Sequence, residues 1–309
     1  MCYSAQLVAA HHRYLRLTGA EMDFDQFKEI YGVRLHDPSV RIPRAVDRWF
    51  AQPRSEAELE LGTLAERHRS AEIAKLEREL FALRKRTADA DRLLATKPTK
   101  SAAESKRIAA DKTTRALARL DRLRDPTPND EDARIFPMHF APVVLQSGDR
   151  RVVRLARYHI RRPGDPATTD RKWPGLYNAR RDNLERFWRG QFGTTHAVML
   201  ADSFFENVQR EGRNQVLHFT PRPAEAMFVA CLYAEWTDPR DGRRLLSFAA
   251  VTDEPPPEVA AAGHDRMIVS LKPEHLDAWL RPVGRSTEEL QAILSDRQAP
   301  YYEHVAVAA

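Results

Sequence analysis

The first two residues, Met1 and Cys2, could supply an unusual nucleophile. Cysteine is small enough for an aminopeptidase to remove the methionine ahead of it, which would leave Cys2 with an α-amine and a thiol on adjacent carbons. The amine titrates near neutrality, at about 7.7–8.0, and can attack an aldehyde. The thiol can then close on the imine to give a five-membered thiazolidine. This end of the chain predicts covalent capture of aldehydes, unless Cys2 is only an ordinary residue behind the initiator methionine.

Three later stretches place polar residues where an apolar strand pattern would exclude them. Asn178 follows a tyrosine, Glu206 ends an apolar run, and His264 comes just before another apolar run. An amide, a carboxylate and an imidazole are groups that carbonyl chemistry and proton transfer use. Each also has an ordinary interpretation, with Glu206 as a strand-end surface charge and His264 as a turn residue.

The composition indicates a chain with a substantial core and few cysteines. Its 309 residues are 42% hydrophobic, enough for one large domain or two modest ones. No apolar run reaches membrane-spanning length and the start has no signal-peptide pattern, so we expect a cytoplasmic protein without a membrane partner. The two cysteines, Cys2 and Cys231, form neither a metal-ligand pattern nor a disulfide framework. We expect no metal and no cofactor, and we expect Cys231 to pack in the core.

Residues 54–125 have the pattern of two long helices. Ser55 with Glu58, and Ser101 with Glu104, form capping boxes, and Lys97-Pro98 separates the two segments. Each segment has an apolar face, made of Ile73, Leu76, Leu80 and Leu83 in the first and of Ile108, Leu117, Leu120 and Leu123 in the second. We therefore predict an antiparallel helical hairpin, preceded by short helices near residues 11–17 and 25–31.

The hairpin is the most basic part of the sequence. Residues 84–124 contain 13 Lys and Arg against 5 Asp and Glu, a net charge of +8, whereas the whole chain carries +5. A mild overall charge is compatible with nucleic acid but does not require it. The excess could be a solvated helix face, or it could form an arm that faces phosphates or binds a protein partner.

The sequence after residue 135 has the pattern that is typical of a β-sheet. Short β-branched and apolar runs alternate with turns, at residues 143–145, 152–156, 196–201, 227–235, 245–252 and 267–271. A late helix is expected at residues 285–294, because Ser286 and Glu289 form a third capping box.

Taken in order, the motifs resemble those of the SRAP family, the SOS response-associated peptidase or abasic-site processing proteins. That family begins with Met-Cys and then carries Asn-Ala-Arg, an apolar strand ending in aromatic-Glu, and His-Asp-Arg-Met. The sequence has these motifs at Met1-Cys2, Asn178-Ala179-Arg180, Phe205-Glu206 and His264-Asp265-Arg266-Met267. The resemblance covers the N-terminus and about residues 135–305.

The resemblance implies an α+β fold with a mostly antiparallel, barrel-like β core and flanking helices. Residues 1–52 and 129–309 would form this catalytic domain, and residues 53–128 would be an inserted basic hairpin. The sequence departs from the family pattern at Tyr3-Ser4, where Gly-Arg is usual, and at Asn207, where a Trp usually follows the glutamate. These departures concern the DNA groove more than the covalent step.

The resemblance also implies a mechanism. The Cys2 amine would attack the opened sugar of an abasic site, which is a masked aldehyde, and the thiol would close the thiazolidine. Glu206 would shuttle protons, His264 would protonate the sugar ring oxygen, and Asn178 would orient the N-terminal residue. An associated peptidase or lyase activity would accompany this covalent capture.

The implied partner is single-stranded DNA that contains abasic sites, in a DNA-damage or SOS response. Arg180 and Arg266 would bind flanking phosphates as bidentate donors, and Trp173 remains from the family's Trp-rich DNA-binding segment. We expect a monomer associated with the nucleoid.

Two alternatives come from other functional classes. An N-terminal-nucleophile amidohydrolase would use Cys2 against an amide, with its own amine as the base. It would need an oxyanion hole and usually Gly-rich substrate loops, and the sequence has only 12 Gly. A DNA- or protein-binding scaffold would keep the groove and the hairpin, with only vestigial chemistry.

Overall fold

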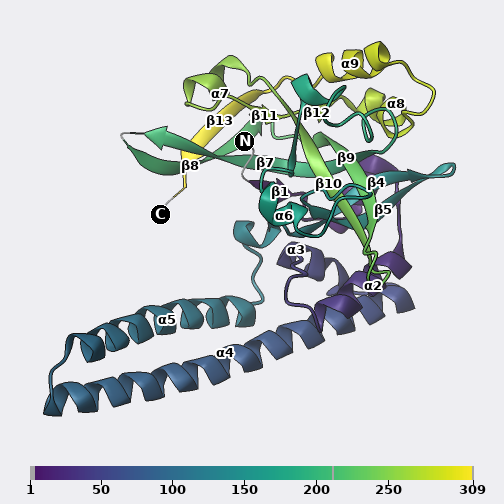
Figure 1. The fold of residues 1–309 in the computed structure, drawn as a ribbon. Coiled ribbons are helices and arrows are strands. Elements are labelled where there is room, and N and C mark those ends of the chain that lie inside the picture. Colours follow the sequence, from purple (N-terminus) through teal and green to yellow (C-terminus); the bar gives the residue numbers. More distant parts are fainter. Residues whose placement is uncertain (1–3, 211, 308–309) are drawn as a thin grey trace. The chain divides into compact units, whose positions relative to one another are not determined.

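The computed structural model describes residues 4–210 and 212–307, so the predicted nucleophile Cys2 lies outside the described residues. The chain divides into two compact units. One unit runs to Leu59 and resumes at Asn129, and the other is Glu60–Pro128. The first unit holds the strands and the second holds most of two long helices (Figure 1). Across the part of the chain described here, no helix combines the length and apolarity needed to span a membrane.

Five strands close into a barrel at the centre of the first unit. Strand β4 (Phe140–Ser147) pairs with β5 (Arg150–Tyr158), β5 with β10 (Arg244–Asp253), β10 with β9 (Met227–Thr237), β9 with β7 (His196–Arg210), and β7 again with β4. All of these pairings are antiparallel except β5–β10, which is parallel. Most residues of β4 and β9 are buried, as in strands that are covered on both faces. The predicted α+β class with a mostly antiparallel, barrel-like core is confirmed.

Shorter strands extend this core and bring distant segments to it. Strand β1 (Ser4–Leu7) lies between β7 and β3 (Arg134–Ile135), while β8 (Arg213–Arg222) continues from β7 and pairs with β13 (Tyr301–Ala306). Strands β6 (Asn178–Arg180) and β11 (Met267–Ile268) both pair with β10, β2 (Glu21–Met22) pairs with β5, and β12 (Ser270–Leu271) pairs with β9.

Helices flank the barrel. They are α1 (His11–Thr18), α2 (Phe24–Arg34), α3 (Arg44–Asp47), α6 (Thr169–Lys172), α7 (Pro257–Ala261), α8 (Leu276–Leu280) and α9 (Thr287–Ser295). Helix α8 is fixed to β7 by Trp279, whose indole nitrogen donates to the carbonyl of Ala197 at 3.0 Å and whose ring stacks on His196 at 4.0 Å. Helix α9 begins with the predicted capping box of Ser286 and Glu289, which is confirmed.

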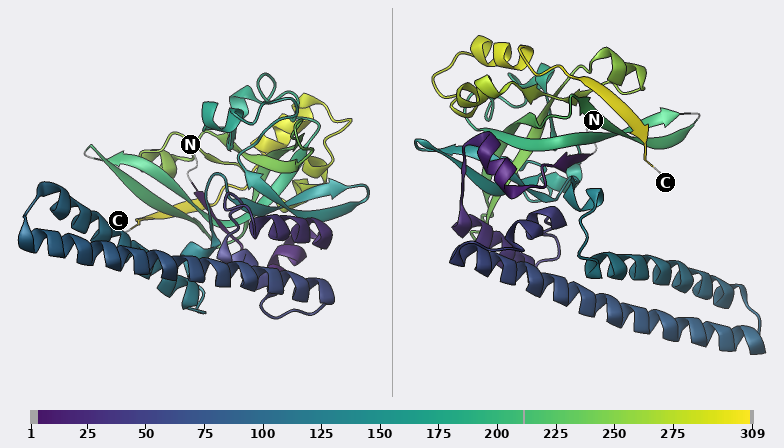
Figure 2. Two further views of the ribbon diagram at one scale, coloured as in Figure 1. Left: turned by 60° about the horizontal axis from the view of Figure 1, so that its bottom comes forward. Right: turned by 180° about the vertical axis from the view of Figure 1, so that it is seen from behind.

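The second unit is dominated by α4 (Glu56–Thr96) and α5 (Lys100–Arg124), which run side by side (Figure 2). Their contact is an apolar seam of Leu76, Leu80, Ala116 and Leu120, with Ile73 and Leu123 packed against it. Ion pairs cross the seam from Glu72 to Arg119 and from Glu77 to Arg124, both at 2.5 Å. The predicted pair of helices around Lys97-Pro98 is therefore present.

The start of α5 differs from its predicted cap. Ser101 lies inside the helix, and Thr99 is the N-cap, with its hydroxyl accepting from the backbone N–H of Ala102. Thr99 has extended backbone angles and follows Pro98, so the chain turns into the helix two residues earlier than the Ser101–Glu104 pattern predicts. At the start of α4, Ser55 accepts from the N–H of Glu58 as predicted.

Candidate active site

A buried carboxylate on β7 contacts a histidine from a distant loop. Strand β7 alternates its faces, so Phe204, Glu206 and Val208 share one side, and all three are buried. Glu206 is 0% exposed, and its Oε2 lies 3.1 Å from Nε2 of His264. The structure thus brings together two residues that are 58 positions apart in the sequence, and it does so between apolar neighbours that exclude water.

His264 lies in the loop between α7 and β11. Gly263 precedes it with a φ of 100°, a conformation that favours glycine, and this residue sits close to Val208 on β7. The His264 ring is buried, and its Nδ1 lies 2.6 Å from the carbonyl oxygen of Arg266. The loop therefore holds the ring in place from one side while the other side faces Glu206.

Both ring nitrogens of His264 have polar neighbours. Nδ1 lies 2.6 Å from the carbonyl oxygen of Arg266 and 3.3 Å from the backbone nitrogen of the same residue, so it donates to the first or accepts from the second, according to the tautomer of the ring. In either tautomer the contact of Nε2 with Oε2 of Glu206 needs one proton between the two atoms. The pair therefore shares a proton. Burial lowers the pKa of His264, so the ring gives up a proton readily.

Asn178 carries a buried amide on strand β6, which pairs with β10. Its residue pairs with Ala250 of β10, and its Oδ1 accepts from the hydroxyl of Tyr158 at 3.5 Å. Among the residues that the structure describes, its Nδ2 has no hydrogen-bond partner. A buried donor left in that state costs about 1–3 kcal/mol. The amide is therefore available to a further acceptor.

The end of β10 explains why the two motifs meet. Thr252 pairs with Arg180 on one side and with Ile268 on the other, so the Asn-Ala-Arg and His-Asp-Arg-Met segments flank the same strand. Arg180 binds Asp182 through two nitrogens, at 3.1 and 2.5 Å, and Arg266 approaches the same carboxylate at 3.6 Å. Asp182 thus links the two predicted phosphate-binding arginines, and the Arg180 side chain is half exposed.

A stacked arginine lies beside the start of the chain and was not predicted. Ser4 pairs with Phe205, the residue before Glu206. The Arg134 guanidinium lies 3.8 Å from the centre of the Phe205 ring, and its Nε donates to the Ser4 hydroxyl at 2.8 Å. The Phe205 ring also stacks on His218 at 4.2 Å. The arrangement fixes a positive charge at the first described strand. No sequence motif identifies Arg134, because strand pairing alone brings it there.

The remaining predicted residues lie elsewhere. Trp173 follows α6, and its indole is 54% exposed beside Lys172, whose Nζ is 5.9 Å from the ring centre. Cys231 is fully buried in β9, and burial raises the pKa of its thiol, so the predicted packing role is confirmed. In the described ranges, no three His, Cys, Asp or Glu side chains are grouped to hold a metal ion.

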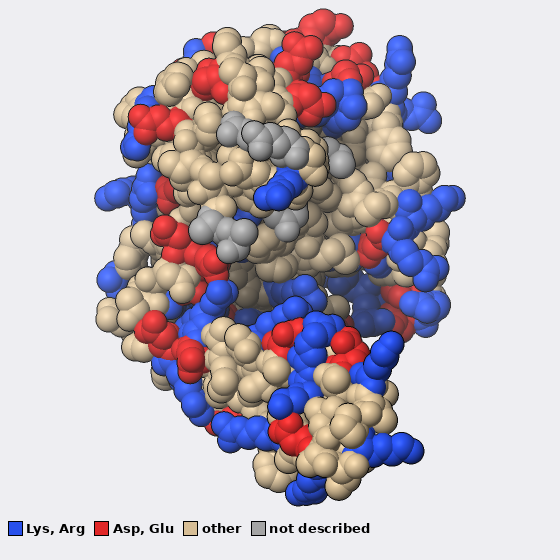
Figure 3. Space-filling view, turned by 90° about the vertical axis from the view of Figure 1, so that its left-hand side faces the viewer, with Lys and Arg blue, Asp and Glu red and all other residues tan. Residues whose placement is uncertain are grey.

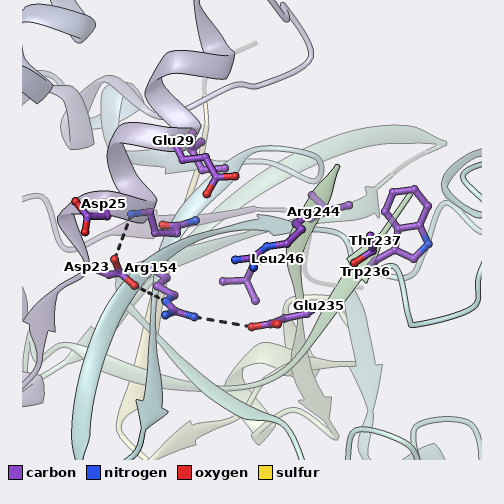
Figure 4. A pocket seen from close by; sticks show the side chains of 12 residues that line it. Asp23, Asp25, Glu29, Arg154, Glu235, Trp236, Thr237, Arg244 and Leu246 are labelled. Atoms are coloured by element: carbon purple, nitrogen blue, oxygen red, sulfur yellow. Dashed lines mark hydrogen bonds and ion pairs between the residues drawn. The ribbon is translucent and has the colours of Figure 1, made fainter. Parts of the chain in front are cut away.

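A cavity of about 250 Å³ opens between α2 and the adjoining ends of β9 and β10. In Figure 4, Arg154 lies there between two carboxylates, with Asp23 at 2.7 Å and Glu235 at 3.8 Å. None of the predicted site residues lines it. The cavity is therefore separate from the candidate active site.

Comparisons with known proteins bear on this site. A family model described as SOS response associated peptidase (SRAP) matches residues 97–309, a range that holds Asn178, Glu206 and His264 but not Cys2. The chain is similar to the abasic site processing protein YoaM of Bacillus subtilis (strain 168), with 29% identity over 122 residues, 38% of this chain and 53% of that protein. The chain thus spans about half the length of this curated relative.

Two solved structures are also similar. A protein from Bacteroides thetaiotaomicron is 18% identical, with a TM-score of 0.49, over 58% of this chain and 79% of that one. A protein from Bordetella bronchiseptica is 19% identical, with a TM-score of 0.48, over 57% of this chain and 88% of that one.

Proposed function

Because the chain belongs to the SOS response associated peptidase (SRAP) family, we propose that it captures the aldehyde of abasic sites in single-stranded DNA. The capture is covalent and forms a thiazolidine at Cys2, once Met1 has been removed. The relative named for abasic site processing supports the substrate. The proposal fits a DNA-damage role in the cytoplasm.

The observation that carries the proposal is the Glu206–His264 pair. Its two side chains are buried in contact at 3.1 Å, beside the strand position that pairs with Ser4. Cys2 is two residues before Ser4, and two residues of chain span at most about 7 Å. This span is long enough for the proposed nucleophile to reach the acid–base pair.

The proposed reaction balances with the loss of one water. His264 donates a proton to the sugar ring oxygen while Glu206 takes the proton of the anomeric hydroxyl, which opens the ring to the aldehyde, and the contact between the two side chains returns that proton to His264. The α-amine of Cys2 adds to the aldehyde carbon, and Glu206 carries one amine proton to the carbonyl oxygen. The resulting hydroxyl leaves as water with the second amine proton, which gives the imine. The thiol sulfur then adds to the imine carbon, and its proton goes to the nitrogen.

Asn178 serves to orient Cys2. Its buried Nδ2 is available, and the backbone carbonyl of the N-terminal residue is a suitable acceptor for it. The same acid–base pair is placed to assist hydrolysis of the Met1–Cys2 bond or an elimination at the captured sugar. These peptidase and lyase steps are secondary to the capture.

The proposed DNA contacts are Arg180, Arg266 and Trp173. Arg180 and Arg266 share the carboxylate of Asp182, and a bound phosphate would replace that carboxylate as their partner. The exposed indole of Trp173 offers a flat surface for an unpaired base, with Lys172 near it for a phosphate.

The test is incubation with an abasic single strand, followed by a denaturing gel. We expect a shifted covalent band from the wild-type protein and none from Cys2→Ala, with both proteins binding the strand under native conditions. Hydrolysis of glutamine or a peptide amide without a shifted band would favour the amidohydrolase. Binding with neither activity would favour the scaffold.

A further inference from the structure

An aromatic side chain stands exposed on the long helix α4. Phe81 is 75% exposed, although its neighbours in the helix, Leu80 and Leu83, are buried in or beside the seam with α5. A large apolar ring in water gains nothing for the fold of the hairpin. A single exposed apolar side chain is common on protein surfaces, so the residues around Phe81 decide whether it marks a binding site.

Cations surround this ring on the same face of the helix. Arg78 is three residues before Phe81, and Arg84 and Lys85 are three and four residues after it, a spacing that places side chains side by side. All three are exposed, and none forms an ion pair with a carboxylate in the described part of the chain. The acidic neighbour, Glu77, is occupied by Arg124 at 2.5 Å.

Several other cations of the hairpin form ion pairs with carboxylates of the same hairpin. Lys106 binds Asp91 at 2.8 Å, and Arg107 binds Glu104 and Asp111 at 2.7 and 3.0 Å. On the side of the hairpin that faces the viewer in Figure 3, positive and negative side chains are mixed. Within the described residues, Arg78, Arg84 and Lys85 have no carboxylate partner, and unlike other such cations of the hairpin they surround an exposed aromatic ring.

We propose that Arg78, Phe81, Arg84 and Lys85, the Phe81 patch, form a contact for single-stranded DNA. The ring stacks on an unpaired base, and the three cations bind the phosphates on either side of it. A partner helix would need a continuous apolar stripe, whereas this patch has one aromatic ring among cations. A polyanion with exposed flat bases matches it better. The contact is independent of the chemistry at Cys2.

The test uses the full chain and an undamaged single-stranded oligonucleotide, so no covalent capture can occur. Binding is measured by fluorescence anisotropy over a series of salt concentrations. We expect Phe81→Ala to weaken binding by about 5- to 150-fold. The triple change Arg78→Gln, Arg84→Gln and Lys85→Gln should lower the slope of log K against log salt by about 2, at about 0.7 per phosphate contact.

Matched controls come from the same hairpin. Leu93→Ala removes another exposed apolar side chain of α4, 57% exposed, and should leave binding unchanged. The change of Arg92, Lys106 and Arg107 to Gln removes three cations that already have carboxylate partners, and the salt slope should stay near that of the wild type. With duplex DNA, Phe81→Ala should have little effect, because paired bases cannot stack on the ring.

Two results would overturn the proposal. One is wild-type affinity for the single strand in Phe81→Ala. The other is self-association of the wild type in sedimentation that Phe81→Ala abolishes while DNA binding is retained, which would make the patch an interface between two copies. Circular dichroism on each variant checks that the helices persist. Cross-linking to an abasic strand is measured separately, so failure there would not be mistaken for failure here.

Discussion

Replacing Glu206 with Gln tests the proton-sharing pair directly. The amide has the shape of the carboxylate but cannot accept a proton, so the contact with His264 at 3.1 Å would no longer hold an exchangeable proton. One general acid or base contributes about 10²–10⁴-fold to a rate. Glu206 is 0% exposed, so water cannot take over its role, and we expect a loss near the middle of that range, about 10³-fold. At about 1.4 kcal/mol per tenfold, this is about 4 kcal/mol of barrier.

The same change should leave the fold intact. A buried carboxylate is costly to desolvate, so a neutral amide of equal shape should keep or slightly raise the free energy of unfolding. The assay is the single-turnover rate of covalent capture, followed on denaturing gels with an abasic single strand. Urea unfolding of the same preparation measures stability. Glu303→Gln is the matched control, because Glu303 is a surface carboxylate paired with Arg222.

A double change decides whether the two residues act as one unit. If Glu206 and His264 share a proton, then Glu206→Gln combined with His264→Ala should be about as slow as the slower single variant, since the unit is already broken. Independent roles would instead multiply the two losses. A wild-type rate of capture in both single variants would refute the assignment of this pair.

Three further predictions concern the N-terminus, the hairpin and a buried histidine. Intact mass spectrometry should show a mature chain that begins at Cys2, and a protein that retains Met1 yet cross-links DNA would contradict the thiazolidine mechanism. Removing residues 70–121 with a short linker should keep the barrel folded and capture intact, while the salt dependence of binding falls; an unchanged salt slope would mean that the hairpin does not contact DNA. His196 accepts from the N–H of Gly193 at 2.9 Å, and burial lowers its pKa to about 3. The pKa of His196 is lower in the folded state than in the unfolded state. Its contribution to the free energy of unfolding is therefore complete above about pH 6.5, and it is lost at about 1.4 kcal/mol per pH unit as the pH falls toward 3. In urea unfolding, the free energy of unfolding of His196→Gln should fall less steeply with decreasing pH than that of the wild type. An equal dependence on pH in both proteins would contradict this prediction.

The sequence identifies the central polar residues of the candidate site better than the residues around them. Glu206 and His264 stand out because each breaks an apolar pattern, and the structure places them in contact. Asp182 and Arg134 do not stand out, because an acidic residue in a turn and a basic residue before a short strand are ordinary. Their roles depend on which strands pair, and a single sequence does not fix pairing between segments that are far apart along the chain.

The same limit applies to the elements. Strands with long buried runs, such as β4 and β9, are recognised from their composition. Strands β8 and β13 were not predicted, because polar residues fill most of their exposed positions and β13 buries little besides Tyr302. The cap of α5 shows the opposite difficulty, since Thr99 and Ser101 are both capable caps and only the observed backbone distinguishes them.

The scaffold alternative can be weighed against the position of Glu206. Asn207, where the sequence departs from the family, lies on the other face of β7 and bonds to Asn214 of β8 at 3.0 Å. That departure therefore leaves the contact between Glu206 and His264 untouched. A protein that only binds DNA has no use for a carboxylate with no exposed surface between Phe204 and Val208. An apolar residue there would stabilise the barrel, because burial of an ionisable group lowers stability. The proposed proton transfer accounts for this buried carboxylate.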